Sequence, residues 1–169
     1  MKDKDESRRA KQVRLQDRVF FVGFFILLNL AEDVNVERKM VKKDLIPQLH
    51  AALSRSSTDL LCLCLSFVKK LSIFEENKDV LRDMNIVAKL TKFIPCTHQQ
   101  LTIDTLKLLF NLSFDTAIRE QMLQMGLVPK LIQLLKTPAL RGRTLKLLYH
   151  LSVDDRCKSM FAYTEGTSM

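Results

Sequence analysis

The sequence contains few of the residues that form tight turns. Only 4 of its 169 residues are glycine and 4 are proline, and tryptophan is absent. Leucine, lysine, methionine and glutamine, which favour helices, are abundant instead. Because two-residue β-hairpins depend on glycine-containing turns, this composition argues against a β-rich fold and predicts helices throughout the chain.

Acidic residues are outnumbered, and no long apolar run occurs. The chain has 27 Lys and Arg against 19 Asp and Glu, a formal net charge of +8. This excess favours an acidic partner. The apolar runs fall short of the roughly 20 residues that a membrane-spanning helix needs, so no membrane insertion is expected. With 47% hydrophobic residues, the chain is still apolar enough to fold around a core as one domain.

Neither the cysteines nor the histidines form a metal-binding pattern. Cys62 and Cys64 lie two residues apart in an apolar, helix-like run, and no CxxC pair occurs. A zinc site needs clustered ligands. The other cysteines and the histidines stand alone: Cys96, Cys157, His50, His98 and His150. We therefore expect buried, reduced thiols that behave as small apolar side chains, and no metal or other cofactor.

Motifs for catalysis are also missing. The sequence has no HExxH or GxSxG, and its glycines are isolated, so no phosphate-binding loop is predicted. Two carboxylate pairs, Glu75-Glu76 and Asp154-Asp155, stand at predicted helix starts, where negative charge complements the helix dipole. These carboxylates are expected to stabilise helix ends, and the sequence does not predict an enzyme.

What the sequence does contain is a repeat of about 40 residues. Four segments align: LLNLAED, KKLSIFE, LFNLSFD and YHLSVDD. Their shared leucines, Leu30, Leu71, Leu112 and Leu151, are separated by 41, 41 and 39 residues. An apolar position that recurs with this period predicts stacked copies of one helical unit.

A second landmark follows each of the first three leucines. It reads DLIPQL, NIVAKL or GLVPKL and opens with Asp44, Asn85 or Gly126. Asp, Asn and Gly tolerate the left-handed backbone conformation that ends a helix. In GLVPKL, Pro129 then falls in the first turn of the next helix, where its missing N–H costs little. The landmark therefore predicts a turn between two helices.

Each repeat is predicted to contain three helices. Ile118, Met122 and Met125, at i, i+4 and i+7, indicate a short first helix before Gly126, and a second follows it. A third helix, about residues 100–113, is apolar on most sides, which suits the inside of a stack. Three helices with this period are typical of armadillo repeats. We therefore predict an all-α fold, a right-handed armadillo-repeat solenoid with three full three-helix repeats flanked by partial ones.

The stretch VFFVGFFILLNLAED, Val19–Asp33, has two interpretations. Basic residues precede it and the small Ala31 lies near its end, as in a secretory signal. Its Leu30 is in phase with the three later leucines, so we predict a core helix that stays in the mature protein. The armadillo repeats are expected over residues 19–164. The predicted N-terminal part is a charged segment or cap (1–18), followed by a leading third helix (19–31). Three full repeats follow, at about 33–72, 74–113 and 115–152. The chain is then predicted to end with a partial repeat (153–164) and a divergent or truncated tail (165–169).

A polar stripe marks the predicted binding surface. Gln100, Asp104, Lys107 and Asn111 follow one another at intervals of 4, 3 and 4 residues on one third helix. In an armadillo stack the third helices line a concave groove. There an Asn amide can pair with a peptide's C=O and N–H, and Lys and Arg favour acidic segments. The alternative is an ordinary solvated helix face. The predicted groove residues are Asn29, Ser66, Lys70, Lys107, Asn111, Arg143, Lys146 and His150.

The absence of tryptophan indicates what kind of peptide the predicted groove would bind. Nuclear-import adaptors built from armadillo repeats pair each groove Asn with a Trp four residues earlier. The matching positions here hold Phe25, Ser66, Lys107 and Lys146. Lysine at these positions would repel the basic import signals that those adaptors bind, which again favours an acidic ligand.

Several distinctive strings resemble one family of armadillo proteins. SIFEENK, LKLLFNLSFDTAIREQM, GLVPKL and DDRCKSMFAYT, with the apolar stretch at 19–33, are similar to the kinesin-associated protein family over about residues 19–164. The resemblance implies a non-catalytic adaptor that binds tail or stalk segments of kinesin-2 motor subunits and links them to cargo adaptors. It also implies a cytoplasmic, microtubule-associated location that includes the cilium and ciliary base, and a role in cilium assembly and intraciliary transport.

Two other interpretations are left open. A general armadillo scaffold of adhesion, signalling or nuclear transport would bind acidic peptide segments through the same groove. A nucleic-acid binder is suggested only by the net charge. It is disfavoured because the aromatic residues are mostly Phe inside apolar runs, so none is evidently available to stack bases. No small-molecule substrate is predicted.

Overall fold

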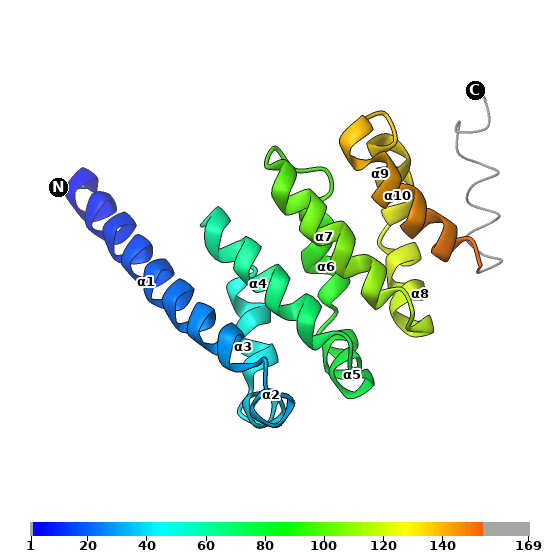
Figure 1. Cartoon of the computed structure of the whole chain (residues 1–169). Coiled ribbons are helices and arrows are strands. Elements are labelled where there is room, and N and C mark those ends of the chain that lie inside the picture. The colour runs from blue at the N-terminus through cyan, green and yellow to red at the C-terminus, as the bar shows by residue number, and fades with distance from the viewer. Residues whose placement is uncertain (1, 154–169) are drawn as a thin grey trace. The chain divides into compact units, whose positions relative to one another are not determined.

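The computed structural model describes residues 2–153, with side chains from residue 5 onward. Within these residues the chain forms ten α-helices and one short 3-10 helix and has no strand (Figure 1). The all-helical prediction is confirmed, and the helices are compatible with a helical repeat solenoid. The predicted partial repeat 153–164, apart from its first residue, and the tail 165–169 lie outside the described residues, as do Asp154, Asp155 and Cys157. The chain divides into two compact units between Phe67 and Val68.

The first unit contains α1 (Lys2–Leu30), α2 (Val34–Val41), α3 (Leu45–Ala52) and most of α4 (Thr58–Leu71). Asp33 begins α2 as its N-cap, because its carboxylate accepts hydrogen bonds from the backbone N–H groups of Asn35 (2.7 Å) and Val36 (3.2 Å). The helix α1 is continuous over 29 residues. The charged segment 1–18 and the third helix 19–31, expected as separate parts, therefore belong to one helix.

The position of α1 corrects the prediction that its apolar stretch lies inside the stack. Phe24 is only 3% exposed, but Leu30, the first of the repeated leucines, is 53% exposed. On α7 (Gln99–Leu112) the corresponding apolar positions are buried beside α6 (Ile86–Leu90). Residues 2–18 extend α1 instead of forming two helices that could cover it in this way. The large apolar side chains left exposed on α1 are Val13, Leu15, Val19, Phe20, Val22, Phe25, Ile26 and Leu30.

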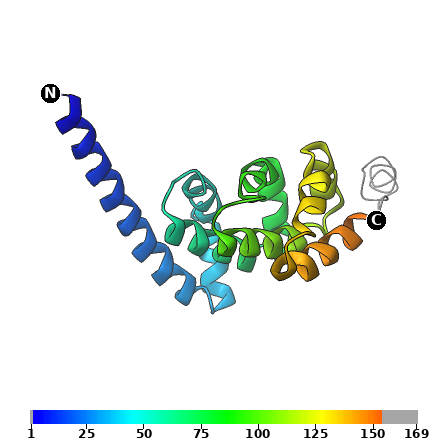
Figure 2. The same cartoon turned by 90° about the horizontal axis from the view of Figure 1, so that it is seen from above.

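The second unit contains two consecutive three-helix repeats. Their third helices, α7 and α10, pack against each other and run side by side (Figures 1 and 2). The expected helix over residues 100–113 is confirmed as α7. The elements of the unit are the end of α4, then α5 (Glu75–Asp83), α6, the 3-10 helix η1 (Thr91–Phe93), α7, α8 (Thr116–Gln124), α9 (Leu127–Leu134) and α10 (Pro138–Leu151).

The repeated leucines form the core of the second unit. Leu71, Leu112 and Leu151 are each fully buried, at 0% exposure. The prediction of a buried leucine is thus confirmed for three of the four repeats. At the start of α5, Glu75 and Glu76 lie in the first turn as expected, where their charges complement the helix dipole. No helix in the described part of the chain, the long α1 included, meets the length and apolarity needed to cross a membrane.

The left-handed turns predicted from the second landmark are confirmed. Asp44, Asn85 and Gly126 have φ values of 59°, 49° and 64°, and each lies immediately before the second helix of a repeat. Residues with a Cβ atom are strained in this region, and Asn, Asp and Gly are the residues that adopt it most readily. The three repeats therefore share a left-handed residue immediately before the second helix, although the side chain at this position differs.

Two glycine substitutions should test this left-handed conformation by changing stability in opposite directions. A Cβ added at Gly126 or at Gly142 meets no atom within 4 Å, so neither substitution causes a clash. Gly126→Ala should lower the free energy of unfolding by about 1–2 kcal/mol, because alanine is strained at positive φ. Gly142→Ala, within α10, should raise it by about 0.5–1 kcal/mol, because alanine favours the helix. Urea unfolding followed by circular dichroism measures both changes, and equal signs would contradict the assignment.

Candidate partner-binding face

Five of the eight predicted groove residues lie on the two packed helices of the second unit. Lys107 and Asn111 come from α7, and Arg143, Lys146 and His150 come from α10. We call these five residues the α7–α10 face. A sixth, Lys70, lies in the last turn of α4 within the same unit, whereas Asn29 on α1 and Ser66 on α4 belong to the first unit.

Most residues of the polar stripe on α7 form hydrogen bonds or ion pairs with one another. The side-chain amide of Gln100 donates a hydrogen bond to Asp104 Oδ2 at 2.8 Å, and Lys107 Nζ pairs with Asp104 Oδ1 at 2.8 Å. Asp104 is only 8% exposed, so its carboxylate needs these partners. The charge of Lys107 is therefore offset in place. Sequence analysis placed Lys107 correctly on the stripe but did not foresee that Asp104 would neutralise it.

The two asparagines use their amide groups within the chain. Asn29 Nδ2 donates to the backbone carbonyl of Phe25 at 2.9 Å, one turn back on α1. Asn111 Nδ2 reaches the backbone carbonyl of Lys69 at 3.5 Å, across to the last turn of α4. The second contact is long for a hydrogen bond, so a ligand carbonyl could replace it at little cost. Asn111 is half-buried and Asn29 is exposed.

His150 belongs to an aromatic cluster that joins α10 to α7. Its Nδ1 lies 2.9 Å from the hydroxyl oxygen of Ser113. Its ring centroid is 4.3 Å from that of Phe114 and 5.7 Å from that of Phe110. Lys78 Nζ lies 5.9 Å from the Phe114 ring, within cation–π range. His150 therefore has a packing role on this face besides any contact with a ligand.

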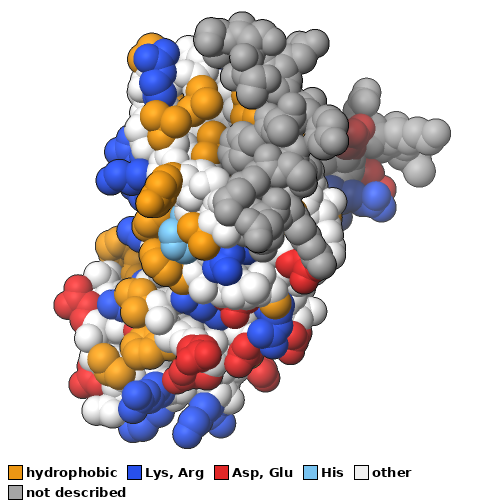
Figure 3. All heavy atoms as spheres, turned by 90° about the vertical axis from the view of Figure 1, so that its right-hand side faces the viewer, with side chains coloured by type: hydrophobic (Ala, Val, Ile, Leu, Met, Phe, Trp, Pro, Cys, Tyr) orange, Lys and Arg blue, Asp and Glu red, His pale blue; other side chains and the backbone are white. Residues whose placement is uncertain are grey.

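Sequence analysis missed the exposed apolar residue that accompanies each repeated leucine of the second unit. Ile73, Phe114 and Val153 each follow a repeated leucine by two residues and are 69%, 57% and 66% exposed. Figure 3 shows hydrophobic side chains beside a histidine on the side of the molecule that carries α8 to α10, with Lys and Arg around them. The recurrence of apolar residues after each leucine was the signal that could have identified them.

The cations of the α7–α10 face that lie on α10 form no ion pair with the described residues. Arg143 and Lys146 are exposed, and Arg143 Nη1 lies 3.4 Å from the backbone carbonyl of Ala139 on its own helix. None of the ion pairs within residues 5–153 involves Lys70, Arg143 or Lys146. These positive charges can attract a carboxylate-rich segment without first breaking an internal pair.

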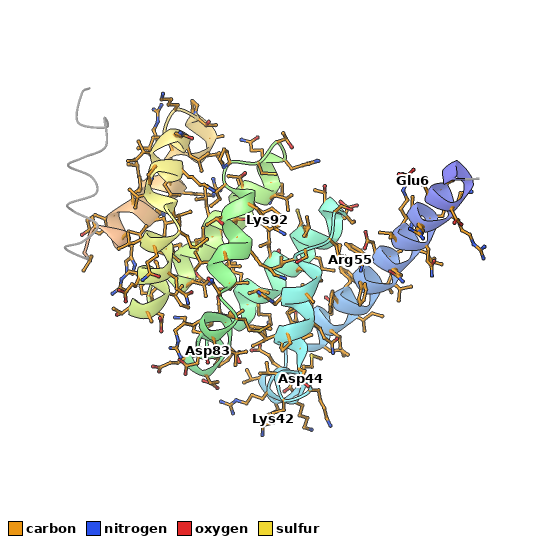
Figure 4. The ribbon with its side chains drawn as sticks, turned by 180° about the vertical axis from the view of Figure 1, so that it is seen from behind. Glu6, Lys42, Asp44, Arg55, Asp83 and Lys92 are labelled. Atoms are coloured by element: carbon orange, nitrogen blue, oxygen red, sulfur yellow. The ribbon has the colours of Figure 1, made fainter. Side chains whose placement is uncertain are left out.

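Two surface hollows lie away from the predicted groove residues. One, of about 390 Å³, is in the second unit, where Gln121 Nε2 donates to the backbone carbonyl of Arg82 at 3.0 Å. Arg82 is held there by Asp79 (2.7 Å) and Asp83 (3.3 Å), and Figure 4 labels Asp83 at the end of α5. The other hollow is in the first unit and is lined by Arg14, Asp17, Arg18, Phe21, Val22, Ser57 and Asp59.

The cysteines do not form a reactive or metal-binding centre in the described part of the chain. Cys64 is fully buried, and burial raises the pKa of its thiol to about 12. The thiol therefore stays protonated and unreactive at neutral pH. Cys62 and Cys96 are half-buried. Among residues 5–153, no group of three or more His, Cys, Asp or Glu side chains is arranged to hold a metal ion.

Recurring three-helix units define the class of helical repeat proteins. The chain belongs to the kinesin-associated protein family, because the family model for kinesin-associated protein (KAP) matches residues 2–169. The match includes residues 2–18 and 165–169, which sequence analysis set apart from the repeats. The family is non-catalytic, and membership gives the chain a kinesin-associated role.

Proposed function

We propose that the chain is part of a non-catalytic adaptor that binds the tails of kinesin-2 motor subunits and links them to cargo. The observation that carries this proposal is the family match over residues 2–169. The adaptor acts in microtubule-based and intraciliary transport. Its location is the cytoplasm, on microtubules and at the cilium and ciliary base.

The α7–α10 face is the docking surface that we propose for an acidic segment of a motor tail. Arg143 and Lys146 support the proposal most directly, because they are exposed and form no ion pair with the described residues. Lys107 contributes less, since Asp104 already offsets its charge at 2.8 Å. Asn111 adds an amide that can exchange its 3.5 Å contact for one with a bound backbone.

Charge reversal on α10 should therefore weaken the binding of a motor tail. Arg143→Glu combined with Lys146→Glu is expected to reduce affinity for an acidic kinesin-2 tail segment at least about tenfold, and to reduce the salt dependence of binding. Lys42→Glu combined with Lys43→Glu is the matched control, because both lysines are exposed in the turn between α2 and α3. Titration calorimetry with the full chain measures the affinities, and circular dichroism checks the helical content.

The outcomes separate specific docking from general attraction. Equal losses in the two double variants would show that only net charge matters, and unchanged affinity in both would place the docking site elsewhere. A peptide with the same composition as the tail segment but a scrambled order is the second control. Equal affinity for the scrambled peptide would favour a general scaffold for acidic segments over a motor adaptor.

A further inference from the structure

The helix α1 has two faces with different surroundings. One face carries Asp17 and Phe24, seven residues apart, and Ala31 follows directly after the helix end; these residues are 6%, 3% and 1% exposed. Arg55, labelled in Figure 4, comes from the segment between α3 and α4. It forms an ion pair with Asp17, and its Cζ lies 5.1 Å from the centroid of the Phe20 ring. This inner face attaches α1 to the rest of the first unit and fixes which side of the helix points outward.

The opposite face carries a row of apolar residues in a coiled-coil pattern. Leu15, Val19, Val22 and Ile26 follow one another at intervals of 4, 3 and 4 residues. They are 63%, 66%, 55% and 53% exposed. This spacing is that of alternating a and d positions in a heptad, with β-branched Val19 and Ile26 at the a positions. We call these four residues the α1 seam.

Repeat symmetry indicates that the seam positions require a covering helix. Val19 and Ile26 correspond to Leu60 and Phe67, 41 residues later on α4, and both of those are fully buried. On α1 the helix continues toward its N-terminus, and its N-terminal end extends away from α3 and α4 (Figures 1 and 2). A helix in this position can be covered along the seam by another long helix.

The charge distribution along α1 identifies the kind of helix that fits. Residues 5–18 of α1 carry five cations against three carboxylates, whereas Glu32 and Asp33 follow the seam with no cation between residues 19 and 33. A helix running in the same direction would place like charges side by side. A copy of α1 running in the opposite direction places the cations opposite the carboxylates, and it also opposes the two helix dipoles. The cations are Arg8, Arg9, Lys11, Arg14 and Arg18.

We propose that two copies of this chain associate through antiparallel packing of their α1 helices along the α1 seam. Antiparallel coiled-coil packing sets a positions against d positions. Leu15 then lies against Ile26 of the second copy, and Val19 lies against its Val22. The same alignment brings Lys11 beside Glu32 of the second copy. The contact uses the same patch on both chains, as two-fold symmetric dimers do.

The expected dimer is weak and depends on concentration. The seam runs from Leu15 to Ile26, which are eleven steps apart, or about 16.5 Å at the helical rise of 1.5 Å per residue. Such a contact lies at the small end of specific interfaces, so we expect a dissociation constant on the order of 10 µM or weaker. The proposal goes beyond the binding of motor tails, since it concerns the first unit and a second copy of the chain.

Sedimentation velocity of the full chain tests the association. From about 1 to 200 µM, the range in which weak complexes form, the mass should rise from 19.6 kDa toward twice that value. Val22→Glu should abolish the rise, because it places a charge in the apolar seam. Ile73→Glu should leave the rise unchanged, because Ile73 is even more exposed than Val22 (69% against 55%) but lies in the second unit. A chain that stays monomeric throughout, or one that dimerises despite Val22→Glu, would overturn the proposal.

A charge exchange tests the antiparallel orientation. Lys11→Glu alone and Glu32→Lys alone should each weaken the dimer, because each places like charges together. The double variant should restore the wild-type dissociation constant. An equimolar mixture of the two single variants should dimerise more tightly than either alone, because every pair in the mixed dimer is then complementary. Failure of both the double variant and the mixture to recover affinity would overturn the antiparallel arrangement.

Discussion

Replacing Leu112 by alanine is expected to lower the free energy of unfolding by about 2–5 kcal/mol. Leu112 ends α7 and is 0% exposed, as are Leu71 and Leu151 at the same position of their repeats. Removing its three terminal carbon atoms leaves a cavity between packed helices that are tied to the repeat on both sides. The loss therefore includes the lost burial and the lost contacts around the cavity.

Leu145→Ala is the matched control for this core substitution. The chemical change is identical, but Leu145 is 50% exposed on α10, so we expect a loss of under about 1 kcal/mol. Urea unfolding of both variants by circular dichroism gives the comparison. Similar losses would show that the repeated leucine position is not the core position of the unit.

Replacing Arg55 by alanine should lower stability by about 3 kcal/mol, because it leaves a buried carboxylate without its cation. Arg55 pairs with Asp17, whose side chain is only 8% exposed, and the Arg55 side chain is itself 24% exposed. Arg55 Nη2 also donates to Gln16 Oε1 at 3.2 Å. These contacts connect the segment after α3 to the middle of α1. Hydrogen exchange should show the largest increase in α1, with chemical unfolding giving the magnitude.

A double substitution separates the loss of the Arg55 contacts from the effect of leaving the buried Asp17 carboxylate without a cation. Asp17→Asn combined with Arg55→Ala should be less destabilising than Arg55→Ala alone, because no charge then stays buried. Arg38→Ala, at an exposed arginine of α2, should cost under about 0.5 kcal/mol. If Arg55→Ala behaves like Arg38→Ala, then the ion pair does not hold α1 in place.

The helices of the second unit and the left-handed turns of all three repeats were predictable from sequence because their signals are local. The spacing of apolar residues predicted the third helix at 100–113, and the structure has it at Gln99–Leu112. Asp44, Asn85 and Gly126 predicted left-handed turns, because few residues accept positive φ. In both cases the deciding physics acts within one turn of backbone, so neighbouring residues carry the information.

The helices that carry the candidate residues were predictable from sequence, but the pairing of their charges was not. Periodicity placed Lys107, Asn111, Lys146 and His150 on third helices, and α7 and α10 carry them. Whether a lysine is free depends on which carboxylate reaches it, and Asp104 lies 2.8 Å from Lys107 Nζ. His150, expected as a groove residue, contacts the ring of Phe114 at 4.3 Å. Side-chain pairing of this kind depends on rotamers and packing, which periodicity does not describe.

The sequence by itself determined the family, the all-helical class and the phase of the repeat, because each depends on residue order and local backbone preference. Only the tertiary structure decided which apolar residues are covered. Leu30 and Leu112 occupy the same place in the repeat, yet one is 53% exposed and the other 0%. Whether a residue is buried depends on which other elements pack against it. The chain before the apolar part of α1 continues the same helix, whereas other repeats have two helices there that cover the third. The same physical reason leaves the α1 seam open to a partner.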